Sequence, residues 1–171
     1  FVSKLSSLYL DASYTIHSCE DKTYGVVNPN AHAAQLVYFV TIQNRNMASK
    51  DYGKYIWFGM PLWDNRNAGG KAGSYIAHDA GTDTLIYAPG STYYFHDSSG
   101  LLPKVGERAR ARADILPIVK TAFAEAKQKG YLQTKTNLNS GTIIASDVSY
   151  FINNNELNAK NWYIDEYRCV D

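Results

Sequence analysis

The stretch YIWFGMPLWDN, residues Tyr55 to Asn65, decides how the chain is expected to fold. Side chains of an extended strand point alternately to its two faces. One face then carries residues suited to a core: Ile56, Phe58, Met60 and Leu62. The other face carries Tyr55, Trp57, Gly59 and Trp63, although Pro61 lacks a ladder N–H and can shift the alternation after it. The segment is therefore predicted to be a strand with one aliphatic and one aromatic face.

The rest of the chain repeats this pattern of short alternating segments separated by Gly, Pro, Asn and Asp. The expected strands are 5–10, 13–18, 35–43, 54–63, 75–78, 84–87, 91–96, 107–113, 142–150 and 162–170. The segment QLVYFVTIQ is apolar on both faces, which is typical of a central strand. We therefore expect a mainly β fold, an antiparallel β-sandwich of the jelly-roll kind. Residues 1–171 match the usual size of one domain.

One segment has helical instead of alternating spacing. DILPIVKTAFAEAKQKG, residues 114–130, places its apolar side chains on one stripe. Asp114 suits an N-cap, Pro117 is tolerated in the first turn, and Gly130 is a stop signal. The sequence thus predicts one α-helix at about 114–130, lying on a sheet or across its open end.

The charge balance limits the partners. Seventeen basic and 16 acidic residues give a formal charge of +1, so no overall field favours nucleic acid or an acidic membrane. No apolar stretch approaches the roughly 20 residues that span a bilayer, and the N-terminal segment lacks a signal-peptide pattern. A start at Phe1 fits a processed protein or a module of a larger secreted protein. A neutral partner is expected.

The two cysteines leave two alternatives open. A bridge between Cys19 and Cys169 would join a first strand to a last one and close almost the whole chain. Two unpaired thiols are the other interpretation. Two cysteines alone do not settle the redox compartment.

Aromatic residues indicate a binding function. The chain has 14 Tyr and 3 Trp against 6 Phe, and the rings of Tyr and Trp combine an apolar body with a polar atom. An indole can stack on the C–H face of a sugar while nearby polar groups bind the hydroxyls. The candidate carbohydrate-binding residues are Tyr55, Trp57, Trp63, Asp64, Asn65, Arg66, Asp79 and Tyr93. The alternative is that both faces of the strand are buried.

Three other segments have a functional and a structural interpretation. TLIYAPGSTYYFHD predicts a hairpin turning at 88–90, whose tyrosines extend the aromatic surface or pair across strands. His78, Asp79 and Asp83, with the DNRN loop, allow a structural calcium ion, and turn capping is the simpler account. The row Arg108, Arg110 and Arg112 could bind a carboxylated or sulfated sugar. More often such a row is solvated and balanced by acids on the next strand, for instance Asp165 or Glu166.

Enzyme signatures are mostly missing. The chain has no G-x-S-x-G, H-E-x-x-H or P-loop motif. A glycosidase needs two carboxyls across a sugar bond, and Asp147 with Asp165 is a permitted pair if their strands are neighbours. His78 or His96 with a tyrosine would permit lyase-type proton transfer. No other cofactor is expected.

The layout resembles secreted β-sandwich domains of the jelly-roll, concanavalin A-like or galactose-binding-like kind. The resemblance rests on YIWFGMPLWDNR, STYYFHD and NWYIDEYRCV. Many such domains are carbohydrate-binding modules attached to polysaccharide-degrading enzymes, so the resemblance implies a secreted, non-catalytic module that binds a neutral polysaccharide or oligosaccharide. The alternatives are a small glycoside hydrolase or lyase on the same scaffold, and a structural or adhesive module with internal aromatics.

Overall fold

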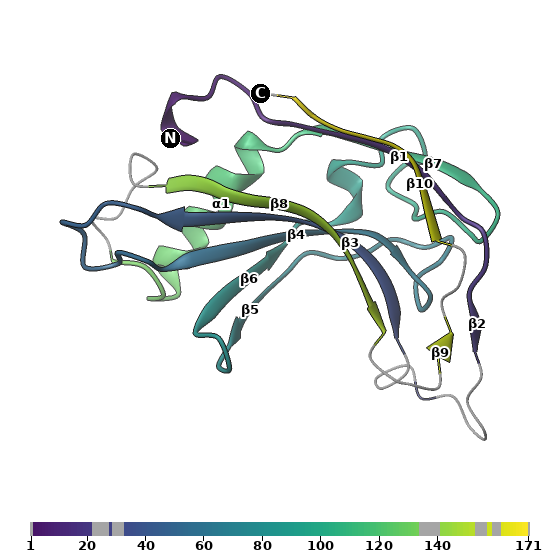
Figure 1. Ribbon diagram of the computed structural model, residues 1–171, viewed down its shortest axis with the longest axis horizontal. Coiled ribbons are helices and arrows are strands. Elements are labelled where there is room, and N and C mark those ends of the chain that lie inside the picture. Colours follow the sequence, from purple (N-terminus) through teal and green to yellow (C-terminus); the bar gives the residue numbers. More distant parts are fainter. Residues whose placement is uncertain are drawn as a thin grey trace.

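The computed structural model describes residues 2–21, 28, 33–133, 141–152, 157–158 and 162–170, and these form a mainly β fold (Figure 1). The strands are β1 (Tyr9–Ile16), β2 (Glu20–Asp21), β3 (Ala34–Asn44), β4 (Tyr55–Asp64), β5 (Tyr75–Asp79), β6 (Thr84–Ala88), β7 (Arg108–Asp114), β8 (Gly141–Ile152), β9 (Leu157–Asn158) and β10 (Trp162–Val170). Two short 3-10 turns, η1 (Val2–Lys4) and η2 (Ser91–Tyr93), and the helix α1 (Leu116–Gln128) complete the described elements. The predicted mainly β class is confirmed.

Two sheets make up the body of the fold. The larger sheet has the strand order β5-β6-β4-β3-β8, the smaller one has the order β10-β1-β7, and β2 pairs with β9. β3 lies between two antiparallel neighbours, as its two apolar faces predicted. β6 runs parallel to β4 and antiparallel to β5. This parallel pair departs from the expected all-antiparallel arrangement.

Three of the predicted strands are wrong. Residues 5–10 and 13–18 are not separate strands, because one unbroken strand, β1, runs from Tyr9 to Ile16 and joins the end of the first segment to the second. Residues 91–96 do not form a strand but contain η2, so the hairpin predicted at 88–90 is absent. Ser91 explains the difference: its N–H donates to the Ala72 carbonyl at 2.9 Å and its hydroxyl donates to the Gly100 carbonyl at 2.5 Å. These bonds turn the chain away from β6.

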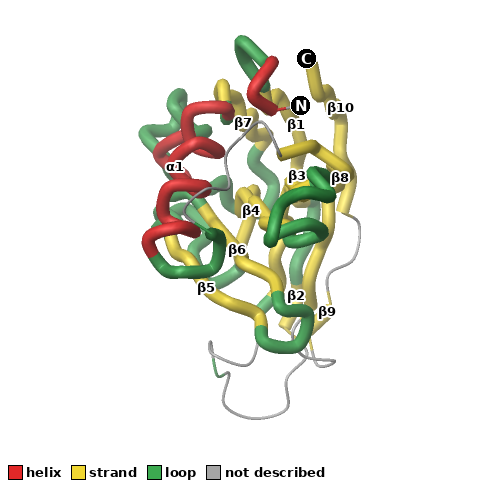
Figure 2. The backbone as a smooth tube through the Cα atoms, turned by 90° about the vertical axis from the view of Figure 1, so that its left-hand side faces the viewer, coloured by secondary structure: helices red, strands yellow, loops and turns green. Residues whose placement is uncertain are grey.

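The helix was predicted correctly to within two residues at each end. An oxygen of Asp114, the last residue of β7, accepts the N–H of Leu116 at 3.1 Å, and Pro117 lies in the first turn. Gly130 follows the helix with φ of 76°, a conformation that glycine adopts without strain. α1 therefore begins directly after β7 and lies along one flank of the larger sheet (Figure 2).

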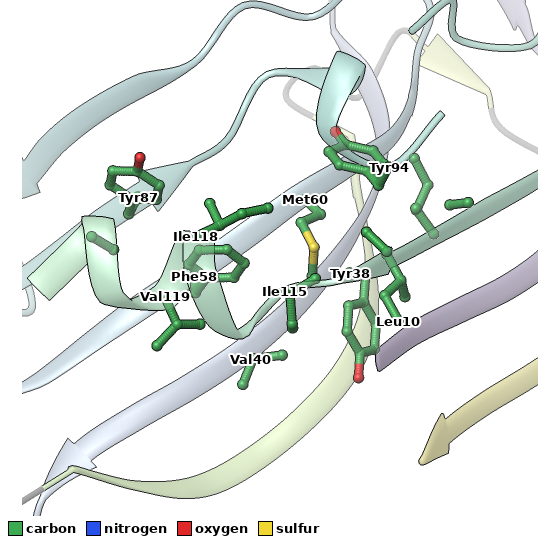
Figure 3. Close-up of a cluster of buried hydrophobic side chains, with 14 of the residues drawn as sticks. Leu10, Tyr38, Val40, Phe58, Met60, Tyr87, Tyr94, Ile115, Ile118 and Val119 are labelled. Atoms are coloured by element: carbon green, nitrogen blue, oxygen red, sulfur yellow. The ribbon is translucent and has the colours of Figure 1, made fainter. Parts of the chain in front are cut away.

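The core lies between the larger sheet and a second layer formed by α1 and the smaller sheet. Phe58 and Tyr87 stack in it with ring centroids 5.7 Å apart and planes 13° from parallel. Figure 3 shows Ile118 and Val119 of α1 among the side chains of this core. The inner face of the larger sheet is thus covered, as its aliphatic side chains predicted.

A bulge interrupts the alternation of β4. Leu36 pairs with Trp63 and the next residue, Val37, pairs with Pro61, so Leu62 is an extra residue on β4. A bulged residue reverses which face the following side chains point to. The phase shift anticipated near Pro61 therefore occurs, one residue later.

The register of the smaller sheet places the segments of the two cysteines at opposite ends of β1. Cys169 pairs with Leu10, and Ile16, at the far end of β1, is six residues along the same strand. At about 3.3 Å per residue this is roughly 20 Å, and Cys19 follows Ile16. A disulfide needs Cα atoms about 4.4–6.8 Å apart.

Candidate functional site

The face of the larger sheet that points away from α1 carries aromatic side chains. From Phe39 to Asn44 of β3 and from Tyr55 to Phe58 of β4, partly exposed residues alternate with buried ones. The partly exposed residues of these strands include Phe39, Thr41, Gln43, Tyr55 and Trp57. Strand register places Ile86 of β6 beside Trp57 and Ala77 of β5 beside Ile86. We call Phe39, Tyr55, Trp57 and Tyr75 the aromatic face.

Trp57 lies at the centre of the aromatic face. Its ring centroid is 5.9 Å from that of Tyr55 and 6.3 Å from that of Phe39, with planes tilted by 55° and 54°. These are the distances and angles of favourable aromatic contacts. The contacts fix the orientation of the indole, and its partial exposure keeps it accessible to a ligand.

Gly59 lies directly beneath an aromatic ring of the neighbouring strand. A methyl group at this position would lie 2.5 Å from Cε1 of Phe39. The space above the glycine is therefore filled by the Phe39 ring of the paired strand, since Phe39 and Gly59 are register partners. The glycine makes room for an aromatic ring of the protein itself, which enlarges the aromatic face.

Tyr75 extends the aromatic face towards a charged cluster. It lies on the edge strand β5 and is 54% exposed. Burial raises the pKa of its phenol, and the positive charge of Arg66 opposes that shift, so the two side chains lie within electrostatic range. Arg66 in turn holds Asp64. The aromatic face thus ends in an arginine and an aspartate.

Asp64 and Arg66 form a two-pronged ion pair. Nε of Arg66 donates to Oδ1 of Asp64 at 2.8 Å and Nη2 donates to Oδ2 at 2.5 Å, while Nε2 of Gln35 donates to Oδ2 at 2.7 Å. Burial alone would raise the pKa of Asp64, but hydrogen bonds from Arg66 and Gln35 outweigh it, and the pKa is lowered. Asp64 is therefore ionised and already saturated with donors. Arg66, with a side chain 33% exposed, is the member better able to contact a ligand.

The predicted grouping of Trp63 and Asn65 with the aromatic face does not hold. Trp63 is 1% exposed, because the bulge at Leu62 turns it into the core. Asn65 uses its side-chain oxygen to accept the N–H of Ala34 at 2.8 Å. Trp57 pairs with Thr41 of β3 and Asp64 pairs with Gln35. These two β3 residues are six positions apart, which is about 20 Å of strand. The polar cluster therefore lies at the far end of this face.

Asp79 and Tyr93 also lie apart from Trp57. Asp79 closes the turn between β5 and β6: its carboxylate accepts the Thr82 hydroxyl at 2.6 Å and the Gly81 N–H at 3.1 Å. These bonds lower the pKa of Asp79, and they match the turn-capping interpretation. Tyr93 is 53% exposed, but it lines a small notch against α1, on the opposite side of the larger sheet.

The described residues contain no group of three or more His, Cys, Asp or Glu side chains arranged for a metal ion. Nε2 of His78 lies 2.8 Å from Oδ1 of Asp83, and both carboxylate oxygens of Asp79 bind the turn. Asp64 faces Arg66 instead. The arrangement expected for calcium is thus not formed by these side chains.

The arginine row of β7 is balanced by a carboxylate on the next strand. Asp11 of β1 accepts Nε of Arg110 at 2.8 Å and Nη2 at 2.6 Å, and it lies 3.9 Å from Nε of Arg112. For Arg110 and Arg112 this matches the acid-balanced interpretation, with Asp11 as an acid among the described side chains.

Two residues of the aromatic face escaped sequence reasoning. Phe39 belongs to a segment that is apolar on both faces, so its exposure depends on which layer covers the sheet. Tyr75 lies on a short strand whose partner cannot be identified from periodicity. The sequence offers one signal for Phe39: a glycine, Gly59, in the middle of the neighbouring strand leaves space for a bulky side chain opposite it.

Comparison of the chain with protein-family models, with curated protein sequences and with solved structures gave no match in any of the three. No helix in the part of the chain that the structure describes has the length and apolar character needed to cross a membrane.

Proposed function

We propose that this protein is a non-catalytic, secreted carbohydrate-binding module that binds a neutral polysaccharide or oligosaccharide on the aromatic face. Trp57 stacks on a sugar ring, with Tyr55 and Phe39 beside it. Tyr75 and Arg66 contact the ligand farther along the sheet. The jelly-roll resemblance of the sequence points to the same class.

One observation carries the proposal: the fold has a well-packed core on one side of the larger sheet and leaves an ordered indole partly exposed on the other. Trp57 is held by two ring contacts but not covered. A fixed, accessible aromatic surface loses little conformational freedom when a ligand binds, which favours affinity. A purely structural module with internal aromatics is disfavoured by the same exposure.

A catalytic function has one specific observation in its favour. His78 and Asp83, paired at 2.8 Å, line a pocket of about 590 Å³ together with Tyr131 and Lys54. The hydroxyl of Tyr131 is committed to the Asp83 carbonyl at 2.6 Å. The carboxyl pair Asp147 and Asp165 belongs to β8 and β10 of different sheets, so they are not neighbours across paired strands. Binding is therefore the better-supported function.

The test is retention on a panel of insoluble polysaccharides, combined with an array of neutral oligosaccharides. The wild-type protein should bind at least one glycan, and Trp57→Ala should weaken that binding by about tenfold or more, equivalent to about 1.4 kcal/mol. Tyr9→Ala is the matched control, because Tyr9 is 42% exposed on β1 of the other sheet. The control should bind as the wild type does.

Two results would contradict the proposal. One is a folded wild-type protein that retains no neutral glycan. The other is a glycan that binds equally well to Trp57→Ala. Release of new reducing ends from the bound polysaccharide, abolished in His78→Ala, would instead establish the catalytic alternative.

A further inference from the structure

A second candidate site is a cleft of about 750 Å³ beside the edge strand β7 of the smaller sheet. Its lining combines an apolar part, including Leu101 and Pro103, with charged side chains from β7 and the preceding loop. Hydrogen bonds stiffen this loop: the Ser98 hydroxyl donates to the Leu101 carbonyl at 2.7 Å, and the Leu102 N–H donates to the Gly70 carbonyl at 2.8 Å. The cleft is therefore built by an ordered loop.

Three cationic side chains line the cleft: Lys104, Arg108 and Arg110. Arg110 is oriented by its two-pronged contact with Asp11, which lies outside the lining. Two carboxylates, Asp97 and Glu107, belong to the same lining, so the cleft presents groups of both charges. Guanidinium and ammonium groups bind carboxylate and sulfate oxygens through charge-assisted hydrogen bonds.

The cleft also contains hydrogen-bond acceptors. Asp97 and Glu107 belong to the lining, and Glu107 accepts the backbone N–H of Lys104 at 2.9 Å. Asp97 is exposed, and the oxygen of Ser98 can accept a hydrogen bond. A bare inorganic anion offers nothing to these acceptors. A ligand with both hydroxyl groups and a negative charge satisfies the two sets of groups together.

We propose that this cleft binds an acidic sugar, meaning a sugar unit that carries a carboxylate or a sulfate ester. Lys104 and Arg108 contact the anionic group. Asp97 and Ser98 accept hydrogen bonds from the hydroxyl groups of the sugar ring. Leu101 and Pro103 pack against the apolar edge of the ring. This inference does not rest on the aromatic face, and it stands or falls separately from neutral-glycan binding there.

The experiment is a titration of the ¹⁵N-labelled protein, followed by amide chemical shifts at constant ionic strength. The probes are glucuronate, galacturonate and glucose 6-sulfate, with glucose, galactose and inorganic sulfate as matched references. At least one acidic sugar should shift amides within residues 95–110, with an affinity about tenfold or more above that of its neutral counterpart and of inorganic sulfate. Added salt should weaken this binding.

A pair of double variants isolates the cleft. Lys104→Gln with Arg108→Gln should reduce the affinity for the acidic sugar by about tenfold or more. Arg45→Gln with Lys50→Gln removes the same charge from exposed positions of the β3–β4 connection and should change it by less than about twofold. The amide spectra themselves show that both variants remain folded.

Four results would overturn the inference. They are the absence of any shift with all three acidic sugars, equal binding of the neutral sugars, equal binding of inorganic sulfate, and an equal loss of affinity in both double variants. Equal binding of sulfate would mean an anion site without sugar recognition. An equal loss in both variants would mean a response to net charge and not a site. Loss of neutral-glycan binding in Trp57→Ala has no bearing on any of these outcomes.

Discussion

Replacing each of the two indoles of β4 by alanine should have clearly different effects on stability. Trp63 is 1% exposed in the core, and truncating a fully buried Trp to Ala costs about 3–5 kcal/mol. Trp57 is partly exposed and makes ring contacts with Tyr55 and Phe39, each worth about 0.5–1.5 kcal/mol. Trp57→Ala should therefore lower the free energy of unfolding by about 1–3 kcal/mol and leave a folded protein.

Equilibrium unfolding in urea, with far-UV circular dichroism as the probe, measures both losses directly. The slope of the unfolding free energy against urea should stay unchanged in both variants, because the surface exposed on unfolding hardly changes. Quenching by acrylamide adds a second readout: the quenchable fraction of the tryptophan fluorescence should fall in Trp57→Ala and should not fall in Trp63→Ala. If Trp57→Ala costs as much as Trp63→Ala, the aromatic face is a buried face and the reasoning fails.

Three further changes test the structure around β4. Asp64→Asn should lower the free energy of unfolding by about 1–3 kcal/mol at pH 7. Hydrogen bonds from Arg66 lower the pKa of Asp64 in the folded state, so this difference in stability should be complete above the ordinary aspartate pKa and should be lost as the pH falls from there through the lowered pKa. Acid unfolding curves of the two proteins measure it. Tyr94→Phe removes a buried hydrogen bond of 2.7 Å to a β4 carbonyl and should cost about 1–3 kcal/mol; burial raises the Tyr94 pKa, so the difference should shrink above about pH 10, where the unfolded tyrosine ionises. Gly59→Ala should displace the Phe39 ring and change the near-UV circular dichroism, with a net cost of at most about 2.5 kcal/mol because alanine favours the strand backbone over glycine.

Period-two alternation was enough to find most strands of this fold and to sort the first half of β4 into its two faces. That signal is local, since it follows from the geometry of one strand. The helix was equally readable from its spacing and its flanking Asp114 and Gly130. The class of fold and the exposure of Trp57 were therefore predictable.

The rest of the candidate site depends on contacts between distant segments. Ser91 turns the chain through bonds to Ala72 and Gly100, which no strand periodicity reveals, and so Tyr93 lies against α1 and not beside Trp57. The register between β3 and β4 likewise places Phe39 opposite Gly59. The spacing of residues within one segment predicts neither the turn at Ser91 nor this register.

The bulge at Leu62 has the largest effect on the chemistry of the aromatic face. Without the extra residue, simple alternation would place Trp63 on the outer face, in line with Tyr55 and Trp57. With it, the indole joins the core and Asp64 takes the outer position opposite Gln35, where it binds Arg66. The β4 part of the aromatic face is thereby confined to the segment from Tyr55 to Gly59, about 13 Å of strand. Under the proposed function, a ligand longer than this is expected to extend across the strands towards Tyr75, where a phenol and an arginine are available as contacts.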